Sequence, residues 1–236
     1  MCSSDLICET SGMRDREAGE RVIGAALKHF GRVDIVIVNA GTNPRKPFAD
    51  STWAEYDEIL QTHMDGAWSL LQAAWPHLVK QHYGRIVVTS SASFLGAMDD
   101  VHYSMAKASM LGLTRGLHVE GIECGIKTNA LLPGAFTQLL VRTPTNSDKY
   151  DWIKENLRPE YVAALVAWLS HEDCSVSGET LMSIGKHICR AFVGFTEGTT
   201  VELPPTPETI NEHFSDIFSP HRYDILDSAA DILSRL

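Results

Sequence analysis

Three short segments that read as strands, two of them rich in Val and Ile, constrain the fold of this chain most strongly. They cover residues 33–38, 85–89 and 127–132. The first is almost continuously β-branched, which is typical of a strand covered on both faces. Segments with helical periodicity separate the three runs. Strands that alternate with helices of this length predict β-α-β units and a parallel sheet, so we expect an α/β fold.

The segments between the strands carry apolar residues at a spacing near 3.6, which predicts helices that bury one face. Pro76 lies inside the longest of these segments and is expected to kink that helix or to restart it. The expected helices cover residues 16–30, 52–82, 101–121 and 159–171, and a further short strand is expected at residues 179–184.

The pattern divides the chain into three parts. Residues 1–12 are polar and without periodicity, which predicts a disordered terminus, and their start also resembles a translated sequencing adapter, so non-native residues are the alternative. Residues 13–186 carry the alternation of strands and helices. Residues 187–236 are punctuated by prolines, and we expect a helical extension with amphipathic helices at residues 207–218 and 224–236.

Composition excludes several classes of function. A formal net charge of −10 argues against a nucleic-acid surface, which needs a basic patch. The sequence contains no run of about 18 apolar residues, the length needed to cross a bilayer, and no signal peptide is visible. We therefore expect a soluble, cytoplasmic protein without a membrane partner. Five widely spaced cysteines without a C-x-x-C pair indicate free thiols, and the ten histidines form no ligand cluster, so no metal site is expected.

Tyr103 and Lys107 carry the strongest chemical signal. They lie in the first turns of the helix expected at residues 101–121, and residues four apart share one face of a helix. Because a nearby ammonium favours the phenolate, Lys107 is expected to lower the pKa of Tyr103 and to make it a base. Ser90 lies at the end of the preceding strand, 13 positions before Tyr103.

The spacing of Ser90, Tyr103 and Lys107 resembles the active-site segment of the short-chain dehydrogenase/reductase family. Two further motifs support this resemblance. The triplet Asn39, Ala40 and Gly41 after the first strand is similar to the family's turn on the adenosine and ribose side of the cofactor. The residues that resemble the loop covering the nicotinamide are Pro133, Gly134, Ala135 and Thr137.

The resemblance implies a Rossmann-like, doubly wound parallel sheet that binds NAD or NADP. Tyr103 would be the general acid and base that exchanges a proton with a secondary alcohol or ketone. Lys107 would hold the ribose hydroxyls of the cofactor. Ser90 would donate a hydrogen bond to the substrate oxygen. Ser91 is adjacent, but only Ser90 has the family spacing.

His63 narrows the resemblance to a subgroup. It occupies a position where many family members have a catalytic Asn, and with its neighbours it resembles the (3R)-hydroxyacyl-CoA dehydrogenases of peroxisomal β-oxidation. That subgroup implies NAD, an acyl-CoA substrate, a homo-oligomer in the full-length protein and, in a eukaryote, a peroxisomal location. The alternative is a buried histidine that satisfies a backbone carbonyl.

The chain departs from the family at its start. The sequence holds no G-x-x-x-G-x-G turn for the pyrophosphate, and the first strands of the family's sheet are expected to be missing. The run at residues 33–38 would then be an open edge, which invites pairing with another chain. Three functions stay open: an oxidoreductase, a non-catalytic fragment or interaction module unable to bind cofactor, and lyase or epimerase chemistry on a bound nicotinamide.

Overall fold

The computed structural model of this chain describes residues 6–10, 12–141, 147–201 and 204–235, so the interpretation of residues 1–12 falls partly outside the described residues. The chain forms two compact units, Met1–Arg190 and Ala191–Leu236. None of the described helices combines the length and the apolarity needed to cross a membrane.

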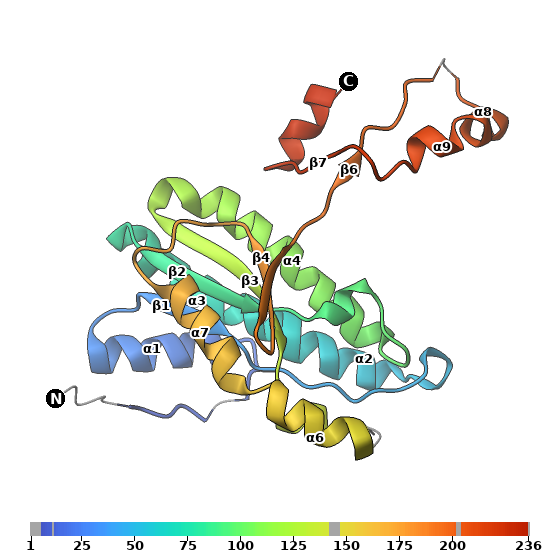
Figure 1. The fold of residues 1–236 in the computed structure, drawn as a ribbon. Helices are drawn as coiled ribbons and strands as arrows, with labels where there is room; N and C mark the ends of the chain where they lie inside the picture. The colour runs from blue at the N-terminus through green and yellow to red at the C-terminus, as the bar shows by residue number, and fades with distance from the viewer. Residues whose placement is uncertain (1–5, 11, 142–146, 202–203, 236) are drawn as a thin grey trace. The chain divides into compact units, whose positions relative to one another are not determined.

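The first unit is built on a sheet of five strands in the order β1-β2-β3-β4-β5 (Figure 1). The first four strands run parallel to one another. This arrangement confirms the predicted α/β class, because parallel neighbours require a crossover connection between them. The strands are β1 (Ile35–Val38), β2 (Gly84–Thr89), β3 (Ile126–Gly134), β4 (Thr180–Ile184) and β5 (His187–Ala191).

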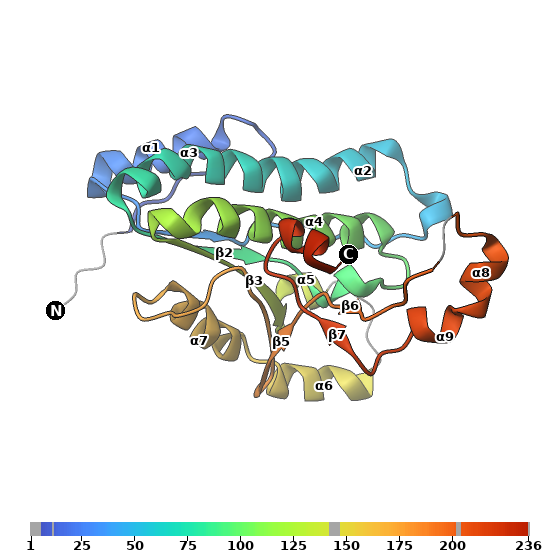
Figure 2. The same ribbon diagram turned by 90° about the horizontal axis from the view of Figure 1, so that it is seen from above.

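Helices cover both faces of this sheet, as Figure 2 shows for α1, α3 and α4 on one side and α7 on the other. Side chains alternate along β2, so Ile86 and Val88 join the cluster under α1, α3 and α4, and Val87 joins the cluster under α7. The helices of this unit are α1 (Ala18–Phe30), α2 (Trp53–Leu60), α3 (Gly66–Gln81), α4 (Val101–Gly121), α5 (Gln138–Val141), α6 (Ser147–Asn156) and α7 (Pro159–Ser170).

The long helix predicted at residues 52–82 is interrupted at a different place from the one expected. Pro76 lies within α3, and the irregularity is a π-helical turn at Gln61–Asp65. Gly66 follows this turn, and a Cβ atom there would lie 2.7 Å from the carbonyl oxygen of Met13. The extra residue of the π-turn places His63 in the interior.

The prediction that the first strand is covered on both faces is wrong. Val36 and Val38 are buried, whereas Ile35 and Ile37 on the opposite face are 46% and 44% exposed. Strand β1 pairs with β2 and is an edge of the sheet among the described residues. The expectation that this run forms an open edge therefore agrees with the position of β1, whereas the expectation of two covered faces does not.

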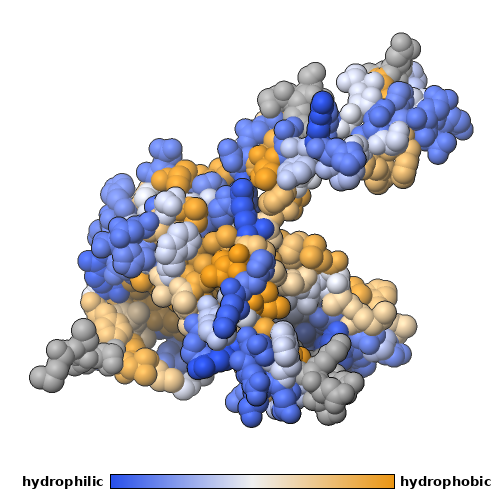
Figure 3. Space-filling model, in the orientation of Figure 1, coloured by the Kyte–Doolittle hydropathy of each residue, from blue (hydrophilic) through white to orange (hydrophobic). Residues whose placement is uncertain are grey.

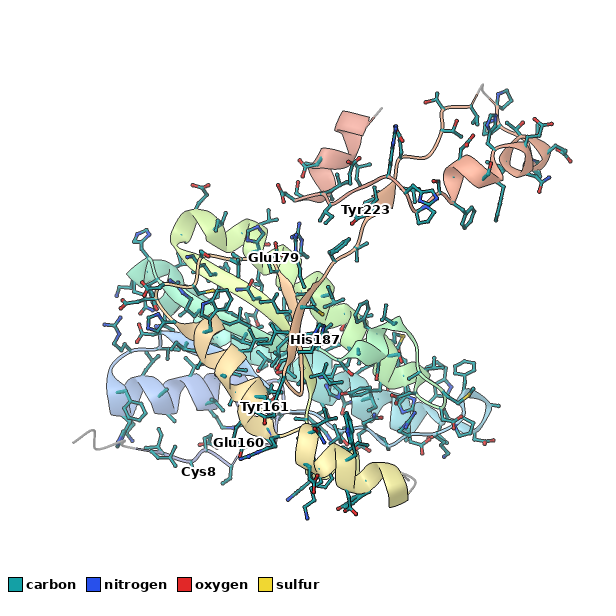
Figure 4. The ribbon with its side chains drawn as sticks, viewed as in Figure 1. Cys8, Glu160, Tyr161, Glu179, His187 and Tyr223 are labelled. Atoms are coloured by element: carbon teal, nitrogen blue, oxygen red, sulfur yellow. The ribbon has the colours of Figure 1, made fainter. Side chains whose placement is uncertain are left out.

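The opposite edge of the sheet is formed by β4 and β5, and an ion pair links the residues beside these two strands. Glu179, labelled in Figure 4, lies just before β4 and accepts hydrogen bonds of 2.6 and 2.8 Å from Arg190 of β5. Hydrophobic surface gathers over these strands in the view of Figure 3, and Ile184 and Ile188 are exposed apolar side chains there.

The second unit is less helical than predicted. Thr206 caps α8 through a hydrogen bond from the Thr209 amide, but the helix predicted at residues 207–218 is split at His213. The helix predicted at residues 224–236 begins later than expected and is a 3₁₀ helix, since Asp224 pairs with Phe195 in a two-stranded ribbon and helical turns start at Ala229. The elements are β6 (Phe195–Thr196), α8 (Pro207–Glu212), α9 (Phe214–Ile217), β7 (Tyr223–Asp224) and a 3₁₀ helix at Ala229–Arg235.

The contact between α1 and α3 gives a first testable prediction. A Cβ atom on Gly19 would lie 2.1 Å from the carbonyl oxygen of Ser69, whereas one on Gly24 of the same helix would meet nothing within 4 Å. We expect Gly19→Ala to lower the free energy of unfolding by about 2 kcal/mol or more, because α1 must move away from α3. Gly24→Ala, the matched control, should raise it by about 0.5–1 kcal/mol through helix propensity. Urea denaturation measures both, and equal effects of the two substitutions would contradict the packing described.

Candidate active site

Tyr103 and Lys107 lie on one face of α4, as predicted, and both side chains are buried. The Lys107 ammonium is 5.5 Å from the centroid of the Tyr103 ring. It donates a hydrogen bond of 2.8 Å to the carbonyl oxygen of Thr89, the last residue of β2. Lys107 therefore joins the first turns of α4 to the carboxyl end of the central strand.

The two consecutive serines after β2 have different partners. The Ser90 hydroxyl is buried and donates a hydrogen bond of 2.7 Å to the backbone carbonyl of Lys107. The Ser91 hydroxyl donates a hydrogen bond of 3.2 Å to the Ser93 oxygen, and the Ser91 side chain acts to lower the pKa of Tyr103. Because side chains alternate at the end of a strand, Ser90 and Ser91 face different neighbours. Ser91 therefore joins Ser90 as a candidate for the serine of the site.

Burial changes the pKa of both Tyr103 and Lys107. It raises the pKa of Tyr103, although the neighbouring Ser91 side chain acts in the opposite direction. Burial also lowers the pKa of Lys107 to about 8. The prediction that Lys107 makes Tyr103 more acidic is therefore wrong for this structure. Desolvation is the largest influence on the pKa of the phenol, and the Lys107 ammonium donates its hydrogen bond to a backbone carbonyl oxygen.

His63 is buried beside the tyrosine, with its ring edge-on to Tyr103 at a centroid distance of 5.4 Å. Its Nε2 atom lies 2.8 Å from the carbonyl oxygen of Thr42. Burial, together with the charge of Lys107, lowers the pKa of His63 to about 4. The ring is neutral at pH 7. Its Nε2 atom can donate to the Thr42 carbonyl in one tautomer and can accept the Thr42 N–H, at 3.3 Å, in the other. A Cβ atom on Gly41 would lie 2.6 Å from the His63 ring, so glycine allows this close approach.

The remaining predicted residues lie along the carboxyl edge of the sheet. Asn39, after β1, accepts a hydrogen bond of 3.2 Å from the Thr89 hydroxyl, and Ala40 and Gly41 follow it. Pro133 and Gly134 are the last two residues of β3. They lie just beyond Leu131, which pairs with Thr89 at the end of β2. Ala135 packs on the cluster under α7, and Thr137 follows in the same loop. The structure thus brings the ends of three strands to one edge, where open α/β sheets bind their ligands.

This edge fits the nicotinamide and ribose half of a dinucleotide. It offers backbone groups after β1 and β3, the buried ammonium of Lys107 and the hydroxyls of Tyr103 and Ser91. The sequence contains no G-x-x-x-G-x-G turn that would hold the pyrophosphate. Among the described residues, no three His, Cys, Asp or Glu side chains come together in a way that could hold a metal ion.

Two residues of this region escaped the sequence analysis. Ser91 was set aside because it lies 12 and not 13 positions before Tyr103. The number of residues between two positions does not say how the loop between them folds back in space. Asp100 is buried three positions before Tyr103. An acidic residue at the start of a helix is usually a solvated cap, so its position alone gave no signal.

Comparison with known proteins identifies the family. A family model described as "Enoyl-(Acyl carrier protein) reductase" matches residues 10–187. The chain is 31% identical over 202 residues to a putative short-chain type dehydrogenase/reductase of Mycobacterium tuberculosis, which covers 85% of this chain and 69% of that protein. The chain therefore belongs to the short-chain dehydrogenase/reductase family.

Proteins named as peroxisomal enzymes are also similar to this chain. The chain is 36% identical over 205 residues to the mouse protein named peroxisomal multifunctional enzyme type 2, covering 85% of this chain and 27% of that protein. It thus spans about a quarter of the length of this relative. The structure of the full-length Drosophila melanogaster enzyme of the same name has a TM-score of 0.83 at 23% identity, covering 98% of this chain and 40% of that one. This structural likeness shows a shared fold.

The buried neutral ring of His63 predicts a pH dependence of stability. Between pH 4 and pH 6.5 the unfolded chain binds a proton at this histidine that the folded chain does not bind, so this contribution to stability falls as the pH drops through the window. We expect His63→Gln to reduce the loss of unfolding free energy between pH 7 and pH 4.5 by about 2 kcal/mol.

The matched control is His29→Gln, which changes an exposed histidine of α1. Urea denaturation of the three proteins at both pH values measures the difference. If His63→Gln and His29→Gln respond to pH in the same way as the unsubstituted chain, the buried neutral state of His63 is refuted.

Proposed function

We propose that this chain transfers hydride between a nicotinamide cofactor and a secondary alcohol or ketone, with Tyr103 as the general acid and base. The observation that carries the proposal is that Tyr103 and Lys107 are buried on one face of α4 at the carboxyl edge of the sheet, where Lys107 Nζ donates to the carbonyl of Thr89 and lies 5.5 Å from the centroid of the Tyr103 ring. Membership of a family of oxidoreductases supports it.

Each side chain has a role that its surroundings favour. NAD or NADP supplies or accepts the hydride when it is bound. Tyr103 gives its proton to the substrate oxygen in reduction and takes one in oxidation, and burial favours its protonated form at rest. Ser91 donates a hydrogen bond to the same oxygen, the role first assigned to Ser90.

Lys107 and His63 set the conditions around the tyrosine. At rest burial dominates the pKa of Tyr103, but Lys107 Nζ lies 5.5 Å from the ring centroid, close to the negative charge that would develop on Tyr103 during proton transfer. Lys107 would also hold the ribose hydroxyls of the cofactor. His63 excludes water from one side of the Tyr103 ring and, through its bond to Thr42, fixes the loop after β1.

The substrate is proposed to be a 3-hydroxyacyl-CoA, oxidised with NAD. The likeness to proteins named peroxisomal multifunctional enzyme and hydratase-dehydrogenase-epimerase supports this substrate class, and with it a peroxisomal compartment in a eukaryote. A homo-oligomer of the full-length protein belongs to the same proposal.

A second candidate function is a non-catalytic interaction module. One observation favours it: β1 is an edge of the sheet among the described residues and exposes Ile35 and Ile37 on its open face. Such an edge pairs readily with another chain. A folded chain that neither binds nor turns over the cofactor would favour this second function.

The proposal predicts how three substitutions affect turnover of a 3-hydroxyacyl-CoA, followed as NADH absorbance. Tyr103→Phe should lower the rate by about 10²–10⁴-fold, because it removes the acid and base. Ser91→Ala should lower it by about 10²–10³-fold, because it removes a donor to the reacting oxygen.

Ser90→Ala is the matched control for Ser91→Ala. It should lower the free energy of unfolding by about 1–3 kcal/mol, because the Lys107 carbonyl loses its hydroxyl donor, while the folded fraction keeps most of its rate. A larger loss of rate in Ser90→Ala than in Ser91→Ala would restore the spacing-based assignment and refute the one proposed.

A further inference from the structure

Arg45 is the one exposed arginine in the described part of the chain whose guanidinium forms no ion pair. It lies in the loop that follows β1. The other exposed arginines of the described residues each pair with a carboxylate, and they are Arg14, Arg16, Arg32, Arg158, Arg190 and Arg222. The chain has a formal net charge of −10, so carboxylates outnumber its cations. A guanidinium that none of them neutralises is available to an anionic ligand.

Hydrogen bonds fix the loop that carries Arg45. The Lys46 amide donates to the carbonyl oxygen of Asp99 at 2.8 Å, and His102 Nε2 lies 2.9 Å from the carbonyl oxygen of Pro44. Both contacts join this loop to the segment that leads into α4. Because the loop is held on both sides of Arg45, the guanidinium is presented from a fixed backbone, which lowers the entropy cost of binding.

The guanidinium itself is held at one corner only. Its Nη2 atom donates a hydrogen bond of 2.7 Å to the carbonyl oxygen of Met98, which leaves further N–H groups of the planar fork for a ligand. The neighbouring Lys46 ammonium is already bound to Glu55 at 2.8 Å. Asp100 of the facing segment attracts Arg45 but is 2% exposed and forms no ion pair with it among the described residues. Arg45 is therefore the cation of this loop that can meet an anion from solution.

Arg45 lies along the same edge of the sheet as the reacting groups. The segment that faces its loop runs from the end of β2 to α4 and joins Ser91 to Tyr103. Three residues before Arg45, the carbonyl oxygen of Thr42 lies 2.8 Å from His63, whose ring is edge-on to Tyr103. A ligand whose reacting carbon lies at Tyr103 can therefore extend over this segment toward the guanidinium.

The facing segment also exposes apolar side chains. Leu95 and Met98 are 79% and 80% exposed, although both are large and apolar. An acyl chain would remove such surface from water, whereas a phosphate group needs a cation. This combination suits a large amphipathic anion better than a small neutral alcohol.

We propose that Arg45 binds a phosphate group of the coenzyme A part of the substrate. The inference rests on the proposed function, since it concerns the thioester substrate named there. It adds a residue that sets the affinity for coenzyme A at a distance from the reacting carbon. A dinucleotide carries phosphate groups as well, so the test distinguishes substrate from cofactor.

The test compares two thioesters with the same acyl group. Isothermal titration calorimetry, with NADH present so that the hydroxyacyl group cannot be oxidised, measures the Kd of 3-hydroxybutyryl-CoA and of 3-hydroxybutyryl-N-acetylcysteamine, which has no phosphate. Arg45→Gln should weaken binding of the CoA thioester by about 5–20-fold, because a charge-assisted contact at an exposed site is lost. It should leave the Kd of the phosphate-free thioester unchanged. Arg45→Lys, which keeps the charge without the planar fork, should restore part of the affinity.

Arg32→Gln is the matched control. It removes an exposed arginine that is paired with Asp34 just before β1, at the opposite edge of the sheet. Both dissociation constants should stay unchanged in this variant. An equal weakening in Arg32→Gln would indicate an effect of net charge alone, and an equal loss for both thioesters in Arg45→Gln would indicate damage to the loop. Either result would overturn the proposal.

Titration with NADH alone separates the two sources of phosphate. Arg45→Gln should respond to NADH as the unsubstituted chain does, and weaker binding of NADH would assign the guanidinium to the cofactor and contradict the proposal. Failure of the unsubstituted chain to bind 3-hydroxybutyryl-CoA would contradict it as well. A chain that binds the CoA thioester through Arg45 but forms no NADH when NAD is supplied would refute the proposed oxidoreductase function and not this inference.

Discussion

The site depends on a reciprocal pair of hydrogen bonds between α4 and the end of β2. The Lys107 ammonium donates to the carbonyl of Thr89, and the hydroxyl of the next residue, Ser90, donates to the carbonyl of Lys107. These bonds cross a buried interface, where a lost partner costs more than it would in water. They fix α4 on the central strand, so Tyr103, one turn away, meets Ser91 as the chain leaves the sheet.

The same burial that holds this interface together sets the acidity of its groups. It favours the neutral form of each: the phenol of Tyr103, the imidazole of His63 and, with a pKa of about 8, the amine of Lys107. A tyrosine in such a place holds its proton until another charge or the reacting oxygen changes the balance. The site therefore rests in a state suited to proton donation, and its use as a base depends on groups that stabilise the phenolate.

Much of the fold followed from periodicity, since alternating strands and helices admit few arrangements of a parallel sheet. The shared face of Tyr103 and Lys107 followed from helix geometry alone. The choice between Ser90 and Ser91 did not, because a count along the chain cannot tell which side chain faces α4. The open face of β1 and the π-turn at His63 depend on which tertiary neighbours are present, and local sequence does not carry that information.

The central claim is that this edge of the sheet receives the nicotinamide half of a dinucleotide, with Lys107 at the ribose. Isothermal titration calorimetry of the folded chain with NADH tests it most directly. The account predicts saturable binding that weakens at least about tenfold in Lys107→Met, where a buried donor is lost without a large change in volume. The absence of saturable binding, or equal binding by the Lys107→Met variant, would contradict it.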